Sequence, residues 1–125
     1  MGSAEDIASG VMAKWAAGFS RVDANALSQL YSTHALFFGS NPKLYRGRDG
    51  VASYFRALPK WNSSSVRFTD VVAEQVNADL VGVAATANFA FDGEALSVKI
   101  TWVIAREDGD WKIVSHHVSS KAPLI

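Results

Sequence analysis

The chain has 125 residues, of which 49% are hydrophobic and 11% aromatic, and 12 Lys+Arg balance 12 Asp+Glu. This length fits one domain (residues 1–125) with a sizeable core, and zero net charge leaves no electrostatic footprint for nucleic acid or an anionic membrane. The absence of cysteine excludes disulfides and thiolate metal sites, and no apolar run approaches the ~18 residues of a membrane-spanning helix. We therefore expect a cytoplasmic domain with no cofactor, no metal, and no nucleic-acid or membrane partner.

Apolar residues at helical spacing predict three helices in the first half of the chain. The first runs from Ala4 to Phe19 and carries two aromatic side chains on its last turns, which suit either a core or the lid of an apolar pocket. The second runs from Ala24 to Tyr31 after a capping aspartate. A short apolar strand, Ala35 to Phe38, precedes the third helix, which runs from Val51 to Leu58 and is stopped by a proline.

From Ser65 onward the apolar period changes to two, as in a half-buried sheet. Short connections separate the runs, and two of them are Asp-Gly pairs, which are strong hairpin signals. The four predicted strands are Val66–Val76, Leu80–Phe91, Glu94–Arg106 and Trp111–Ser120. Helices first and a four-strand antiparallel meander last predict an α+β fold, with the helices covering one face of a strongly curved sheet.

The turn at Asp92-Gly93 sets the register of the central hairpin, because it pairs Phe91 with Glu94. One face of the hairpin then becomes almost wholly apolar, while the reverse face is polar. The polar residues of the reverse face include Thr86, Asn88, Lys99 and Thr101.

The last hairpin decides which of two adjacent histidines faces the interior, because successive strand side chains point to opposite faces. Uninterrupted pairing across Asp108-Gly109 sets Ser115 opposite Trp102 and His117 opposite Ile100. This register predicts that His117 faces the helices and that His116 lies on the polar face. A β-bulge in either strand would exchange the two.

His117 is the leading candidate for chemistry, since an imidazole in an apolar pocket can act as a general acid or base. The interpretation that we favour for His117 itself is a core histidine hydrogen-bonded to a serine or a backbone carbonyl. Asp70 is the one acid expected on the inner row, where desolvation would raise its pKa. Three histidines on two sheet faces and a loop do not form a metal site by spacing. Side chains expected at a ligand site are Trp15, Phe19, Tyr31, Tyr54, Phe89, Trp102, Ser115 and His117.

Several motifs resemble the SnoaL-like branch of the nuclear-transport-factor-2-like superfamily. They include Tyr45-Arg46-Gly47 ahead of Tyr54-Phe55 and the ending Gly109-Asp110-Trp111-Lys112-Ile113-Val114, followed by His117-Val118-Ser119 and Pro123. The ending also resembles the association domain of calcium/calmodulin-dependent protein kinase II. The resemblance covers essentially the whole chain and implies a cone-shaped fold.

In this superfamily an apolar pocket lies between the helices and the concave sheet, and dimers commonly form through the outer sheet face. The resemblance therefore implies binding of a small apolar molecule, with an isomerase or cyclase reaction as the enzymatic version. The inner row of the third long strand carries no acid, so ketosteroid-isomerase chemistry is not expected. A non-catalytic association module is the alternative. The homodimer is expected to use Thr86, Asn88, Lys99, Thr101 and His116.

Overall fold

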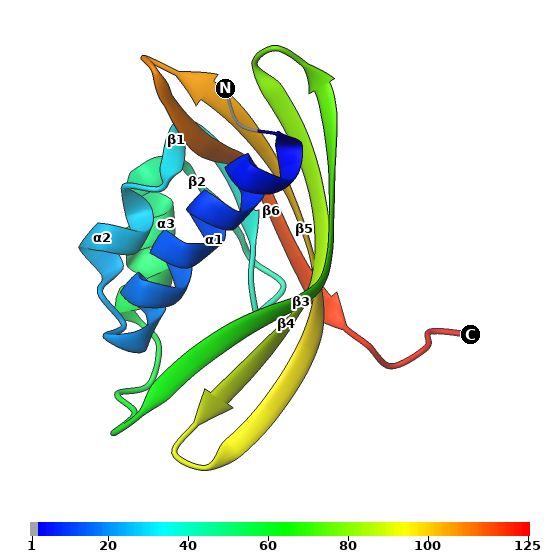
Figure 1. The fold of residues 1–125 in the computed structure, drawn as a ribbon. Helices are drawn as coiled ribbons and strands as arrows, with labels where there is room; N and C mark the ends of the chain where they lie inside the picture. The colour runs from blue at the N-terminus through cyan, green and yellow to red at the C-terminus, as the bar shows by residue number, and fades with distance from the viewer. Residues whose placement is uncertain (1–2) are drawn as a thin grey trace.

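The computed structural model describes residues 3–125, which form three helices and one six-stranded sheet. The elements in chain order are α1 (Ala4–Ser20), α2 (Ala24–Ser28), β1 (Tyr31–Phe38), β2 (Leu44–Arg46), α3 (Gly47–Arg56), β3 (Ser64–Asn77), β4 (Leu80–Phe91), β5 (Glu94–Glu107) and β6 (Asp110–Ser120). All three helices lie on one side of a strongly curved sheet, and the C-terminal tail projects away from the body (Figure 1). The predicted α+β, cone-shaped fold is confirmed.

Local capping explains where the first two helices begin. Ser3 and Asp6 form a capping box at the start of α1, in which each side chain accepts a hydrogen bond from the other residue's backbone N–H. Asp23 caps α2 by accepting from the backbone N–H of Ala26. The predicted second helix was too long at its end, because Tyr31 is the first residue of β1 rather than the last of a helix.

The strands follow the order β2-β1-β6-β5-β4-β3, so the predicted meander forms one side of the sheet and β1 joins β6 in parallel. The short strand β2, which lies in a stretch expected to be a loop, pairs with the end of β1. The central hairpin has the predicted register, with Phe91 opposite Glu94 and Thr86 opposite Lys99.

The predicted register of the last hairpin holds only for its first part, because β6 carries a β-bulge. Ile113 pairs with Ile104 as expected, but Ser115 pairs with Val103, so one extra residue of β6 stands between them. After the bulge His116 lies opposite Trp102 and is 4% exposed, whereas His117 lies opposite Thr101 and is exposed. The inward placement of Ser115 and His117 was therefore wrong, and so was the placement of His116 on the outer face.

A second bulge, in β3, corrects the placement of Asp70. The pairing of β3 with β4 shifts between Thr69 and Val72, and Asp70 adopts a left-handed backbone with φ of 53°. Phe68 lies on the inner side as expected, but beyond the bulge Ala73 is buried while Asp70 is exposed. Asp70 therefore does not face the interior, because the bulge reverses the alternation at that point.

Within residues 3–125 no helix combines the length and apolarity that crossing a membrane requires.

Candidate functional site

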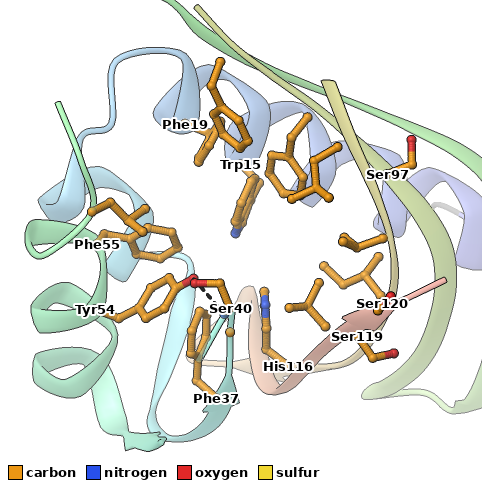
Figure 2. A pocket seen from close by; sticks show the side chains of 18 of the residues that line it. Trp15, Phe19, Phe37, Ser40, Tyr54, Phe55, Ser97, His116, Ser119 and Ser120 are labelled. Carbon is orange, nitrogen blue, oxygen red and sulfur yellow. Dashed lines mark hydrogen bonds between the residues drawn. The ribbon is translucent and has the colours of Figure 1, made fainter. Parts of the chain in front are cut away.

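A cavity of about 480 Å³ lies between the helices and the concave face of the sheet (Figure 2). α1 contributes Trp15 and Phe19, one helical turn apart, whose rings stack with centroids 5.3 Å apart. The other lining residues are Phe37, Gly39, Ser40, Tyr54, Phe55, Leu58, Pro59, Trp61, Phe89, Phe91, Leu96, Ser97, Val98, Ile100, His116, Val118, Ser119 and Ser120. Among the lining residues of the described chain none is Asp, Glu, Lys or Arg, and the polar side-chain groups of the wall are hydroxyls, two indole N–H groups and one imidazole.

His116 is the polar centre of this wall, and its ring is held among aromatic side chains. Phe37 stacks on it with centroids 4.1 Å apart and an interplanar angle of 23°. Nδ1 of His116 lies 2.9 Å from Nε1 of Trp102 and 2.9 Å from the hydroxyl of Tyr31. That hydroxyl also accepts a hydrogen bond of 2.9 Å from Nε1 of Trp15. The network thus joins one side chain from each of α1, β1, β5 and β6.

The direction of these hydrogen bonds fixes the tautomer of the neutral imidazole. An indole N–H can only donate, so Nδ1 of His116 must accept from Trp102 and carries no hydrogen. The hydroxyl of Tyr31 then donates to the same nitrogen. In the neutral ring the hydrogen therefore lies on Nε2.

The Nε2–H group of His116 faces the cavity. Nε2 has no hydrogen-bond partner among residues 3–125, and in the same part of the chain no fully buried side-chain nitrogen or oxygen lacks one. Nε2 is therefore accessible from the cavity that His116 lines, and Figure 2 shows the ring pointing into that space.

Burial determines the protonation of both polar rings. Desolvation, with a smaller contribution from the neighbouring His117, lowers the pKa of His116 from 6.5 to about 3. Desolvation likewise raises the pKa of Tyr31 above its ordinary value. Both groups are therefore neutral at pH 7, in agreement with the hydrogen-bond directions.

A second polar group, at the end of β1, consists of Tyr54 and Ser40. The hydroxyl of Tyr54 donates to Oγ of Ser40 at 2.7 Å and accepts from the backbone N–H of Ser40 at 2.9 Å. Gly39 permits this arrangement, because a Cβ at that position would lie 2.5 Å from the ring of Tyr54. Several lining residues, among them Ser40, Leu96 and Ser120, are exposed, so the cavity is open to solvent.

The residues expected at a ligand site fall into three groups. Those that line the cavity are Trp15, Phe19, Tyr54 and Phe89. Tyr31 and Trp102 stand behind the lining and contact His116. Ser115 and His117 lie on the other sheet face.

Sequence reasoning missed Phe37 and His116, the two stacked rings of the cavity wall. Phe37 was assigned only to a short strand, and His116 was assigned to the wrong face. A signal for His116 was present in its own strand: Ile113 and Val118 are apolar and five residues apart, and they can share one face only across a bulge.

The side chains of residues 3–125 offer no cluster of metal ligands. Within residues 3–125 no group of three or more His, Asp or Glu side chains stands close enough together to hold a metal ion.

Solved structures with the same architecture place the fold in the nuclear-transport-factor-2-like class. A proposed calcium/calmodulin-dependent protein kinase II association domain from Xanthomonas campestris superimposes with a TM-score of 0.86 at 18% identity, covering 100% of this chain and 91% of that one. A proposed dehydratase of that class from Streptomyces avermitilis gives 0.81 at 22% identity, covering 94% and 96%. A proposed scytalone dehydratase from Novosphingobium aromaticivorans gives 0.84 at 12% identity, covering 94% and 84%.

The chain belongs to the SnoaL-like domain family, whose model matches residues 9–123. No curated protein matches the sequence. At these identities the solved structures establish the fold, and the function has to be argued from the site.

Proposed function

We propose that this SnoaL-like domain binds an uncharged, largely aromatic small molecule in the cavity between its helices and sheet. The observation that carries the proposal is the wall itself, which combines stacked and edge-on aromatic rings with a single imidazole and no charged side chain. A volume of about 480 Å³ falls within the range of ordinary ligand pockets.

The lining selects against charged ligands. A carboxylate or ammonium group that entered this cavity would lose its hydration without gaining a partner of opposite charge, which costs several kcal/mol. Flat aromatic ligands gain the contacts that the rings of Trp15, Phe19 and Phe37 offer, with additional stabilisation from offset and edge-to-face geometry.

The same geometry favours binding over an isomerase or cyclase reaction. Such reactions require a group that removes a proton, and Nε2 of His116 already carries one while Nδ1 is occupied by two donors. Asp70, the expected partner, is exposed on β3. No carboxylate among the described residues lines the cavity.

A matched pair of ligands tests the proposal. We expect 2-acetylnaphthalene, an uncharged aromatic ketone, to bind with a Kd on the order of 10 μM, from about 0.5 kcal/mol per non-hydrogen atom. The anion 2-naphthoate should bind about 100-fold more weakly at pH 7, because its charge stays unpaired in the cavity. Isothermal titration calorimetry measures the affinities of the two ligands. Native mass spectrometry of the freshly purified protein shows whether it retains a ligand.

Two valine variants locate the binding. Val118→Trp adds a large ring to the cavity wall and should abolish ketone binding, whereas Val76→Trp at an exposed position of β3 should leave it unchanged. Equal loss in both variants, or equal affinity for the ketone and the anion, would reject the proposal.

Self-association through the outer sheet face is a second candidate function. It is favoured by a row of exposed side chains that crosses five strands, one from each, in consecutive register. The row comprises Val72, Ala84, Thr101, His117 and Phe38. With Thr86, Asn88 and Lys99 beside it, this row forms a mixed apolar and polar surface, which we propose pairs with the same surface of a second copy of the chain. His117, rather than the expected His116, lies on this outer face and would contribute to such an interface.

A further inference from the structure

The tautomer of His116 places a requirement on the ligand in addition to the apolar character that the lining selects. The Nε2–H group of His116 faces a cavity of aromatic rings and has no acceptor among residues 3–125. A ligand that fills the cavity displaces any water from this group, and leaving the donor unpaired then costs about 1–3 kcal/mol. The bound ligand must therefore bring its own acceptor to this point.

We propose that the ligand is a conjugated carbonyl compound, an aryl ketone or a quinone, whose carbonyl oxygen accepts the hydrogen bond from Nε2 of His116. This inference rests on the proposed binding function and names the chemical class that the cavity takes. The stacking of Phe37 on the imidazole fixes the plane of the ring, so the N–H direction is set before the ligand arrives.

A carbonyl fits this position better than a hydroxyl or an amine. A carbonyl oxygen only accepts, so it satisfies the donor and leaves no further hydrogen without a partner. A hydroxyl or amine at the same point would also have to donate, and the side chains that surround His116 offer only ring carbons and groups already engaged. The low pKa of His116 keeps the donor neutral down to acidic pH.

Tyr31 and Trp102 act as positioning residues for this contact. Neither lines the cavity, and both donate to Nδ1, which forces the hydrogen onto Nε2. Without the indole N–H of Trp102, the neutral ring could place its hydrogen on Nδ1 and bond it to the oxygen of Tyr31. Nε2 would then present a lone pair to the ligand instead of a donor.

The first test compares 2-acetylnaphthalene with 2-isopropenylnaphthalene, which replaces the C=O group by C=CH2 at nearly the same shape. Their affinity ratio is measured in the wild type, in His116→Phe, which removes the donor, and in His116→Gln, whose amide can replace it. We expect the ratio to fall about tenfold in His116→Phe and to be restored in His116→Gln. The carbonyl stretch of the bound ketone should also lie at lower frequency than in cyclohexane in the wild type and in His116→Gln, but not in His116→Phe, which has no donor.

The second test needs no ligand and no variant of His116. Nitrogen-15 NMR of the histidine rings at pH 7 should show the Nε2–H tautomer for His116, and Trp102→Phe should change the tautomer signals while His117→Gln leaves them unchanged. A ring found as the Nδ1–H tautomer or as imidazolium in the wild type would overturn the inference. Equal binding of the two naphthalenes in all variants, with no carbonyl shift, would also overturn it but would leave the proposed function intact. Binding of neither compound would reject both proposals.

Discussion

His116 combines burial among aromatic rings with a ring N–H that has no acceptor among residues 3–125. A core histidine whose only role is packing would have both ring nitrogens engaged by protein groups or by ordered water. Here one nitrogen is held by two donors and the other opens onto the cavity. At the scale of the residue this asymmetry supports the proposed ligand, since the ring N–H opens onto a cavity whose lining is largely aromatic.

The depressed pKa of His116 predicts a specific loss of stability in acid. In the unfolded chain the imidazole takes up a proton below pH 6.5, whereas in the folded protein it stays neutral until about pH 3. The unfolded state binds more protons in this range, so the free energy of unfolding falls as the pH is lowered through it. Between pH 7 and pH 4.5 this group alone should remove about 3 kcal/mol.

Urea unfolding at a series of pH values measures this effect. The titratable side chains next to His116 are Tyr31, its hydrogen-bond partner, and His117, its chain neighbour, and the first is neutral throughout the range. His116→Gln should flatten the pH dependence by the amount given above, while His34→Gln, at an exposed position, should keep the wild-type slope. Parallel slopes for all three proteins would show that His116 is not buried as a neutral ring.

The sequence could not predict which of the two adjacent histidines, His116 or His117, faces the cavity. The presence of a histidine in the cavity follows from the strand pattern, but its identity depends on a single extra residue in β6. That bulge lies beside the place where β1 joins β6, and the β1 register shifts there as well, from Tyr31 opposite Ile113 to Leu36 opposite Ser115. Such irregularity reflects contacts between strands far apart in sequence, which strand periodicity alone does not encode.

At the scale of the element, turn chemistry made the meander predictable and bulges limited the prediction. Both Asp-Gly turns have backbones with positive φ at each of their two residues, as two-residue hairpins require, and they fix the registers that were predicted correctly. The bulges in β3 and β6 reverse the alternation partway along long strands. They also add local twist and bend, which helps a sheet that contains two 14-residue strands curve around the helices (Figure 1).

Asp70 supplies the element-scale prediction, because its left-handed backbone conformation defines the bulge in β3. Asp70→Gly should raise the free energy of unfolding by about 0.5 kcal/mol, since glycine adopts positive φ without steric cost. Glu74→Gly, at an exposed position of the same strand outside the positive-φ region, should instead lower it by about 1 kcal/mol. Urea unfolding of the two variants measures the difference.

The Asp70 variant also tests the carboxylate that was expected to act in the pocket. Ketone binding should be unchanged in Asp70→Gly, because the side chain is exposed and does not line the cavity. A loss of binding without a loss of stability would return Asp70 to the site.

At the scale of the whole molecule, the two proposed functions use opposite faces of one sheet. The concave face closes a cavity against the helices, and the convex face presents the row from Val72 to Phe38 to solvent. A chain of zero net charge carries little long-range repulsion between copies, so this face can approach its own copy. The separation also means that changes at one face should leave the function of the other intact.

Thr101, near the centre of the convex row, allows the self-association to be tested. If two copies pair through this face, Thr101→Glu removes two carboxylates from water at the interface and should weaken the dimer by at least about 100-fold. Ser9→Glu adds the same charge at an exposed position of α1 and should leave the dimer unchanged. Sedimentation equilibrium over a range of concentrations gives the association constants, and ketone titration shows that the cavity is unaffected. Two results would reject this face as an interface: a wild-type protein that stays monomeric at every concentration, or a Thr101→Glu variant that associates as tightly as the wild type. Neither result would affect the proposal for the cavity and His116.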